Sequence, residues 1–142
     1  MYAEFEDKFR RLIMPKNTLQ KDEILSRRDL ISSTFENGKS FIEFPFKIVV
    51  NPVELPFKTP VQTLFTVPKR NFKLAVDRNL LRRRIKEAYR KNKHDLYSQA
   101  TSQNLQLAVV IIYISKKEFS YSEIEKKIIL SLDKIQTQIK SL

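Results

Sequence analysis

The stretch LAVDRNLLRRRIKEAYRKNK, residues 74–93, predicts a long amphipathic helix around which the rest of the fold can be arranged. At about 100° per residue, Leu81, Ile85, Ala88 and Tyr89 fall on one side of this helix, which we expect to pack into the core. The adjacent side is polar and mostly positive. This basic face consists of Asn79, Arg82, Arg83, Lys86, Arg90 and Lys93.

The positive charge of the chain is concentrated in this helix and in the residues just before it. Residues 69–93 contain eleven Lys and Arg but only two acids, Asp77 and Glu87, so they carry +9 of the formal net charge of +11. Like charges on one side of a helix repel each other, so stability alone does not explain the arrangement. A solvated basic face is the simpler interpretation, but the richness in arginine favours phosphate, which the planar guanidinium contacts bidentately. We therefore expect the basic face to bind nucleic acid.

What the composition lacks excludes several classes of protein. The absence of Cys excludes disulfides and thiolate zinc sites, and the one histidine, His94, cannot form a His-rich metal site. The one glycine, Gly38, excludes Gly-rich phosphate-binding loops. No secretory signal is evident, and the longest apolar run, residues 107–114, is far shorter than the roughly 20 residues that span a membrane. We expect a cytoplasmic protein without a membrane partner, a metal site or catalytic residues.

The remaining elements are predicted from hydrophobic periodicity. Helices are expected over 26–37 and 121–139, strands over 41–53, 61–67 and 105–114, and a polar loop over 98–104. Ser26 favours the start of the first helix and Asn37-Gly38 a left-handed end, whereas Ser120 and Glu123 form a capping box for the last helix. The order α-β-β-α-β-α predicts an α+β fold, a two-layer α/β sandwich with helices stacked on one side of the sheet.

The length of 142 residues corresponds to one domain. We expect residues 21–142 to form a single RNA-binding domain, and residues 1–20 to form an N-terminal extension. Phe5, Phe9 and Leu12 have helical spacing in that extension, so a docked helix and a mobile segment are both compatible with it.

The kind of nucleic acid is suggested by what the basic helix is not. Nothing in the sequence is typical of a helix-turn-helix pair, a zinc finger or a basic zipper, so reading of DNA bases is not supported. A rigid basic helix on a sheet suits structured RNA. Four phenylalanines near the first helix and strand are mostly expected in the core, although any exposed member is a stacking platform for a single strand. These are Phe35, Phe41, Phe44 and Phe46.

Three segments together resemble a known family. FTVPKR at 65–70, AVDRNLLRRRIKEAYR at 75–90 and the Phe-x-x-Gly turn at 35–38 are similar to the signature of the bacterial ribonuclease P protein component. The resemblance extends over roughly residues 25–135. Leu80 stands where the family has the second arginine of its Arg-Asn-Arg core, so that contact must come from elsewhere, and Arg84 is one candidate.

The resemblance implies a ribosomal-protein-S5-domain-2-like fold with a left-handed β-α-β crossover, although sequence patterning alone favours a right-handed one. It also implies a ribonucleoprotein subunit that helps a catalytic RNA remove the 5′ leader from precursor tRNA. Partners would be that RNA and precursor tRNA, with no obligate protein partner. The cofactor would be magnesium, held mainly by the RNA, so the endoribonuclease centre would lie outside this chain.

Site residues are implied by position. The residues implied to contact the catalytic RNA are Lys69, Arg70, Lys73, Arg78, Asn79, Arg82, Arg83, Lys86 and Arg90. The residues implied to line a cleft for the single-stranded leader, between the first helix and the sheet, are Ile31, Phe35, Lys47 and Val49. The family often has aromatics where Ile31 and Val49 stand, so weaker base stacking is expected here.

Two other functions were weighed. A non-catalytic RNA-binding protein of ribosomal or RNA-chaperone type would share the charge and the architecture. A membrane-surface protein with a polybasic helix would need an apolar face free to insert, whereas Leu81, Ile85 and Ala88 are expected in the core.

Overall fold

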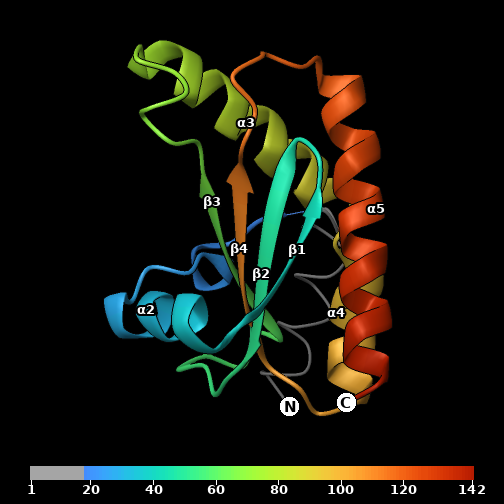
Figure 1. Ribbon diagram of the computed structural model, residues 1–142. Helices are drawn as coiled ribbons and strands as arrows, with labels where there is room; N and C mark the ends of the chain where they lie inside the picture. Colours follow the sequence, from blue (N-terminus) through green and yellow to red (C-terminus); the bar gives the residue numbers. More distant parts are fainter. Residues whose placement is uncertain (1–17) are drawn as a thin grey trace, which may run out of the picture.

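The computed structural model describes residues 18–142, which fold around one four-stranded sheet (Figure 1). The helical elements are the 3-10 turn η1 (Lys21–Glu23) and the helices α2 (Arg28–Asn37), α3 (Ala75–Asn92), α4 (His94–Ser102) and α5 (Tyr121–Lys140). The strands are β1 (Lys39–Glu43), β2 (Phe46–Pro52), β3 (Val61–Thr66) and β4 (Leu107–Tyr113). The predicted apolar stripe Phe5, Phe9 and Leu12 lies outside the described residues.

The sheet has the strand order β1-β2-β4-β3. β1 and β2 pair antiparallel, as do β2 and β4, whereas β3 and β4 pair parallel. The parallel pair is connected through α3 and α4, which lie behind the sheet in Figure 1, with β4 to the right of β3. This crossover is therefore left-handed, the rarer hand for a β-α-β connection.

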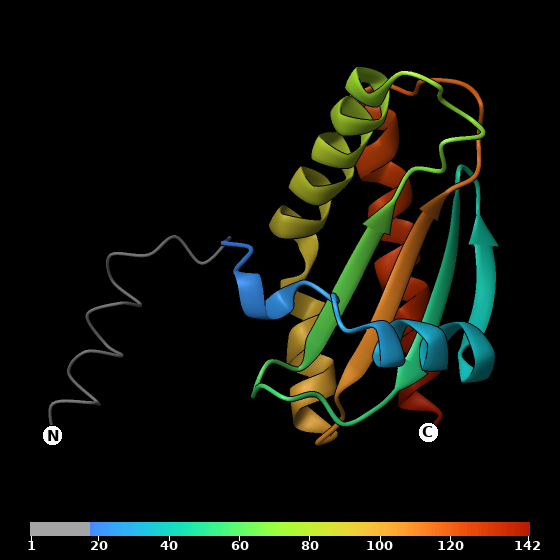
Figure 2. The ribbon, with the colours of Figure 1, turned by 90° about the vertical axis from the view of Figure 1, so that its left-hand side faces the viewer.

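Helices cover the two faces of the sheet unequally (Figure 2). α3, α4 and α5 cover one face, and Leu81, Ile85 and Ile128 pack there against Ile48 and Ile111 in the main core. α2 packs on the opposite face over a smaller cluster of Leu25, Val49, Ala108 and Val110. The expectation of helices stacked on one side thus holds for the last three helices but not for the first. The apolar runs of β2 and β4 bury side chains of both alternating sets, as strands covered on both faces do.

The segment 41–53, predicted as one strand, is a hairpin. β1 and β2 are joined by a two-residue turn at Phe44 and Pro45. Proline has no N–H to donate to a strand ladder, which suits it to this turn. Its carbonyl oxygen still accepts a hydrogen bond of 2.8 Å from the backbone N–H of Ile114. The turn therefore lies at the edge of the sheet where β4 ends.

The predicted polar loop 98–104 is mostly helix. α4 runs from His94 to Ser102 and buries Leu96 and Ala100, which are four residues apart and share one side. The polar residues between them hid this short apolar stripe. Asn104 follows with φ 55°, the left-handed conformation that Asn tolerates better than most residues.

Both predicted ends of the first helix need correction. α2 begins at Arg28, not at Ser26, because Ile24 and Leu25 extend along β3 and the Leu25 N–H donates to the Thr63 carbonyl oxygen at 3.0 Å. Gly38 is not left-handed, since its φ is −73°. A Cβ at Gly38 would stand 2.7 Å from Val49 Cγ1, so the glycine permits a close approach of α2 to β2.

The capping box at the start of α5 is confirmed. The Glu123 N–H donates to Ser120 Oγ at 3.3 Å, and the Ser120 N–H donates to the Glu123 carboxylate at 3.2 Å. In the part of the chain from residue 18 onward, no helix combines the length and apolar character that crossing a bilayer requires.

Candidate nucleic-acid interface

The structure confirms the predicted core side of the basic helix. Leu81, Ile85, Ala88 and Tyr89 are fully buried against the sheet and α5. The Tyr89 hydroxyl accepts a hydrogen bond of 2.8 Å from Thr63 and donates to the Tyr97 hydroxyl at 3.2 Å. Burial raises the pKa of Tyr89, so this hydroxyl stays protonated as part of the core. With one side of α3 locked in this way, the other side must face outward.

Four residues of the basic face lie together around an open depression. Its volume is about 460 Å³, and it is bounded by one side chain of β3, Phe65, and by residues of α3. The residues from α3 are Asn79, Arg82, Arg83 and Lys86. Arg82 donates a hydrogen bond to the Asn79 side-chain oxygen, and Lys86 Nζ lies 6.0 Å from the centre of the Phe65 ring. Three cations next to one another without an acid make this depression suited to an anion of several charges.

Two predicted members of the basic face are engaged elsewhere. Lys93 is only 4% exposed, and its Nζ lies 2.5 Å from Glu23 Oε1 in a buried ion pair. α3 ends at Asn92 and the chain turns into α4, so the helical angle assigned to Lys93 does not apply. Arg90 pairs with Glu87 one turn earlier, at 2.6 Å. The Arg90 hydrogen bond holds the pKa of the Glu87 carboxyl below its ordinary value, which keeps that pair charged.

Arg78 and Arg84 position the loops at the two ends of the parallel strands. Arg78 donates from Nη1 to the carbonyl oxygens of Phe72 and Lys73 at 2.8 and 2.9 Å. Arg84 donates from Nη1 to the Phe119 carbonyl oxygen at 2.7 Å and lies 3.2 Å from the Glu118 carboxylate. Arg84 therefore does not stand in for the arginine that Leu80 replaces.

The linker before α3 supplies further exposed cations. Lys69, Arg70 and Lys73 are all exposed in the connection from β3 to α3. Asn71 and Phe72 attach this linker to the end of β4, through a hydrogen bond of 3.5 Å to the Tyr113 carbonyl oxygen and a ring contact of 5.8 Å with Tyr113. The three cations consequently extend the basic surface of α3 along the edge of the sheet.

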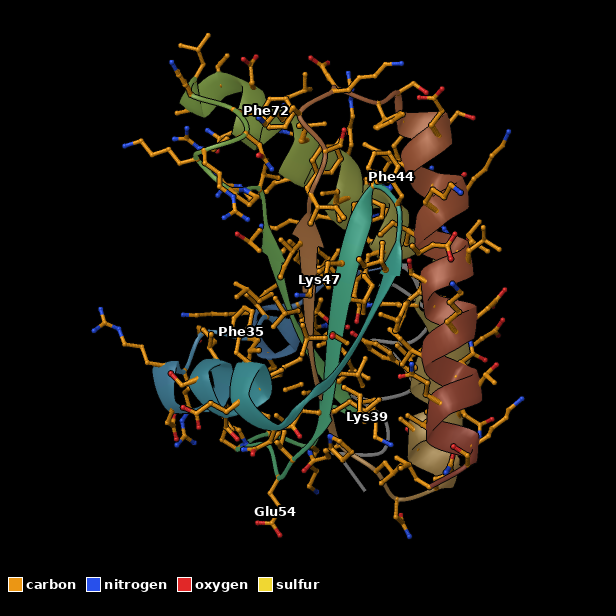
Figure 3. All side chains as sticks on the ribbon, viewed as in Figure 1. Phe35, Lys39, Phe44, Lys47, Glu54 and Phe72 are labelled. Atoms are coloured by element: carbon orange, nitrogen blue, oxygen red, sulfur yellow. The ribbon has the colours of Figure 1, made fainter. Side chains whose placement is uncertain are left out.

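The four residues implied for leader binding separate into two groups. Val49 is 4% exposed and packs with Ile31 in the cluster beneath α2, so neither presents a free surface. Phe35 is 51% exposed on α2, and Lys47 is exposed on β2 (Figure 3). The structure thus brings Ile31 and Val49 together as packing and leaves Phe35 and Lys47 accessible.

The strand register adds two residues that the sequence analysis did not select. Lys47 lies opposite Ile42 of β1 and Ile112 of β4, so these three side chains form a row across the same sheet face that α2 partly covers. Ile42 is 60% exposed and Ile112 is half-buried. An apolar residue that alternates with Lys47 is a usable signal only once the hairpin is known, because the hairpin decides which residues lie opposite each other.

Of the four predicted aromatic platforms, two are accessible. Phe46 is fully buried and Phe41 is partly buried against the core. Phe35 and Phe44 are 51% and 53% exposed. The two accessible rings lie at different places on the molecule, one on α2 and one at the tip of the β1–β2 hairpin (Figure 3).

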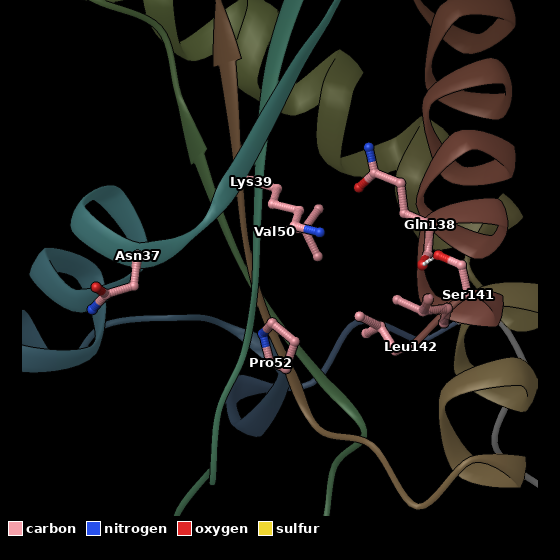
Figure 4. Close-up of a pocket in the computed structure, with 8 residues that line it drawn as sticks. Asn37, Lys39, Val50, Pro52, Gln138, Ser141 and Leu142 are labelled. Carbon is pink, nitrogen blue, oxygen red and sulfur yellow. Dashed lines mark hydrogen bonds between the residues drawn. The ribbon is translucent and has the colours of Figure 1, made fainter.

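No site for a metal ion or a small ligand competes with this surface. Among residues 18–142 there is no cluster of three or more His, Cys, Asp or Glu that could hold a metal ion. A cavity of about 510 Å³ lies between the start of β1 and the end of α5, and aliphatic side chains such as Val50, Pro52 and Leu142 contribute to its lining (Figure 4). It contains none of the predicted site residues.

The fold and the exposed cations define an α+β protein with an interface for a polyanion, in which one helix is anchored by its apolar side and presents arginines on the other. The family model described as Ribonuclease P matches residues 19–136, and the chain belongs to this family, that of the protein component of bacterial ribonuclease P. It is therefore the protein subunit of a ribonucleoprotein endoribonuclease that processes tRNA, and its partner is the RNA subunit.

Individual relatives agree with this assignment. The chain is 29% identical over 123 residues to the ribonuclease P protein component of Porphyromonas gingivalis, covering 87% of this chain and 90% of that protein. It is 34% identical over 119 residues to the component of Chlorobium phaeobacteroides, covering 76% and 80%.

Solved structures share the fold. The RNase P protein from Thermotoga maritima has a TM-score of 0.59 at 21% identity, covering 79% of this chain and 96% of that one. A mutant RNase P protein of Staphylococcus aureus with defective mRNA degradation activity has a TM-score of 0.59 at 16% identity, covering 92% and 96%.

Proposed function

We propose that this chain binds the catalytic RNA through the depression on α3 and the linker cations, and that it thereby assists removal of the 5′ leader from precursor tRNA. The observation that carries the proposal is the grouping of Arg82, Arg83 and Lys86 around one open depression on a helix whose other side is fully buried. A rigid support holds the cations in place before binding, so little side-chain and backbone order is lost when phosphates arrive. Lys69, Arg70 and Lys73 extend the same contact.

The leader of precursor tRNA would lie along the row formed by Ile42, Lys47 and Ile112, beside Phe35. This row is supported as a single-strand surface by its composition, because apolar and aromatic side chains can stack on bases while Lys47 contacts the backbone. Ile31 and Val49 act beneath it by fixing α2 on the sheet. Their aliphatic character is consistent with packing and not with stacking.

The chemistry of cleavage is proposed to reside in the RNA. Magnesium bound mainly by the RNA would activate the attacking water, and the protein cations would reduce the repulsion between two RNA molecules that must come together. The lowered repulsion would be felt most at low magnesium, where fewer cations screen the phosphates. Precursor tRNA as the substrate places the protein in the cytoplasm in this proposal.

Stimulation of a catalytic RNA tests the proposal. The purified chain is added to a bacterial ribonuclease P RNA at limiting magnesium, and cleavage of a precursor tRNA is measured. We expect the chain to raise the rate, and the combined variant R82A/R83A/K86A to lose that effect. The combined variant K39A/K58A/K140A removes three exposed lysines outside the depression and serves as the charge-matched control. No stimulation by the unmodified chain would overturn the proposal.

A further inference from the structure

A second candidate RNA contact lies at the tip of the β1–β2 hairpin. A depression of about 330 Å³, here called the hairpin pocket, is bounded by the turn of the hairpin and the start of α5. The residues that line it are Phe44, Pro45, Phe119, Glu123, Lys126 and Lys127. Its volume is within the range of small-ligand sites, and none of the residues implied for RNA or leader binding lines it.

The hairpin pocket has an aromatic wall that the core does not need. Phe44 is 53% exposed, and its ring meets the Phe119 ring edge-on at 6.0 Å between centres. Phe46, two residues later, is fully buried, so the hairpin already contributes its core aromatic from the other position. Lys117 Nζ lies 5.4 Å from the centre of the Phe119 ring. An exposed ring beside a cation is the combination that single-stranded nucleic acids use for stacking and phosphate contact.

The acids around the hairpin pocket are already engaged. Glu43 lies 2.5 Å from Lys134 and 3.5 Å from Lys127, so it is paired twice. Glu118 is paired with Arg84, and Glu123 caps α5 through the Ser120 N–H.

The remaining charges are positive. Lys116, Lys117 and Lys126 are exposed, and Lys116 and Lys126 form no ion pair with any residue from 18 to 142. The charge around the aromatic wall therefore favours an anion.

The topology places the hairpin pocket at the same edge of the sheet as the linker cations. β3 and β4 are parallel, so the residues that follow them, Lys69–Lys73 and Lys116–Lys117, lie at one edge. The hairpin turn shares this edge because Phe46 pairs with Tyr113, the last residue of β4. Arg84 joins the loop after β4 to α3 through Phe119 and Glu118. The pocket is thus attached rigidly to the helix that carries the basic face.

We propose that the hairpin pocket binds one unpaired nucleotide of RNA, with its base against the exposed side of Phe44 and its phosphate near Lys126. The proposal rests on the proposed function, since it adds a contact at the end of the same basic edge. Positive charge on three sides favours RNA over a second copy of this chain, whose net charge is +11 and whose approach would be repelled.

Tryptophan fluorescence gives a direct test. The chain contains no Trp, so F44W places the only indole in the hairpin pocket. The matched control is F57W, because Phe57 has a similar exposure of 49% but lies in the connection between β2 and β3. We expect single-stranded pentaadenylate to quench F44W saturably. An abasic oligomer of the same length should quench it little, and F57W should show no saturable change.

The affinity for larger RNAs tests the same contact in the full chain. F44A should weaken binding about five- to tenfold, which corresponds to the lower part of the range for one stacked base, whereas F57A should have no effect. Measuring ribonuclease P RNA and precursor tRNA separately shows which molecule supplies the nucleotide. K126A should lower the slope of log affinity against log salt by up to ~0.7, the value for one phosphate of a single strand.

The failures are distinguishable. If the chain stimulates cleavage but F44W is not quenched and F44A binds both RNAs normally, the hairpin pocket inference is wrong and the proposed function stands. If F44W is quenched saturably while the chain does not stimulate cleavage, the reverse holds. If F44A changes only the sedimentation of the free protein, the pocket is a contact between copies and the inference is overturned.

Discussion

Lys93 Nζ lies 2.5 Å from Glu23 Oε1, in a buried ion pair that joins the end of α3 to the segment preceding α2. Lys93 also donates to the Thr18 carbonyl oxygen and lies 5.1 Å from the centre of the Tyr97 ring. The helix proposed to contact the catalytic RNA and the helix proposed to border the leader are thus held by one pair of charges. A lysine that the sequence assigns to the RNA surface instead fixes the relative position of the two helices.

Breaking this pair should destabilise the protein strongly. E23Q leaves the Lys93 ammonium buried without its carboxylate, and loss of one partner of a buried pair costs about 3 to 5 kcal/mol. Unfolding by denaturant measures the change. Adding K93M to E23Q should recover part of the loss, because the second change removes the uncompensated charge. D29N, which breaks the exposed Arg27–Asp29 pair, should have little effect.

The depression on α3 should show its phosphate contacts in the salt dependence of RNA binding. R82A/R83A/K86A should flatten the plot of log affinity against log salt by up to ~0.9 per lost contact, if the value for duplex DNA is used as a guide. K39A/K58A/K140A should change the slope much less at the same change in net charge. An equal slope for both combined variants would mean that binding depends on overall charge and not on the depression.

Phe35 should distinguish precursor from mature tRNA. Its ring is 51% exposed on α2, and a stacked leader base would be lost with F35A. We expect F35A to weaken binding of leader-bearing precursor about five- to tenfold and to leave mature tRNA unchanged. F57A removes a ring of similar exposure elsewhere and should affect neither RNA. Equal losses for the two RNAs with F35A would contradict a leader contact.

Glu43 should make the protein sensitive to acid. The Lys134 hydrogen bond holds the pKa of Glu43 below its ordinary value of 4.5. A carboxyl whose pKa is lower in the folded state contributes stability above its unfolded pKa and loses it as the pH falls through the folded value. The free energy of unfolding should therefore differ between the unmodified chain and E43Q at neutral pH, and the difference should shrink below about pH 4. A constant difference across this range would show that the ion pairs do not contribute.

Gly38 should not tolerate a side chain although its backbone angles are ordinary. A Cβ there would meet Val49 Cγ1 at 2.7 Å and the Val50 carbonyl oxygen at 3.1 Å, and the Thr34 carbonyl oxygen is closer still. We expect G38A to cost about 1 to 3 kcal/mol, as insertions into packed regions do. If the requirement were for a left-handed backbone instead, G38N would be tolerated better than G38A, and comparing the two variants by thermal unfolding separates the explanations.

Local patterns were sufficient where one element determines its own structure. The apolar side of α3 and the capping box of α5 were predictable because both depend on residues within one or two turns of the same helix. The hairpin was missed because Phe44 and Phe46 continue the alternation through the turn at Pro45. α4 was missed because its two buried residues, Leu96 and Ala100, are separated by polar ones.

The site shows the same division. Arg82, Arg83 and Lys86 could be grouped from helical geometry, whereas Lys93 could not be excluded without knowing that Glu23, seventy residues earlier, lies beside it. Ile42 and Ile112 could not join Lys47 before the pairing of three strands was known.

By itself, the sequence determined that an arginine-rich helix with one apolar side carries most of the charge of this chain, since charge and periodicity are properties of neighbouring residues. Only the tertiary structure decided which cations remain available for RNA. Lys93 and Arg84 are consumed by carboxylates and carbonyl oxygens from other elements, and the accessible aromatic rings are those that the packing of strands and helices leaves uncovered. Such assignments depend on contacts between residues far apart in the chain, where no local pattern operates.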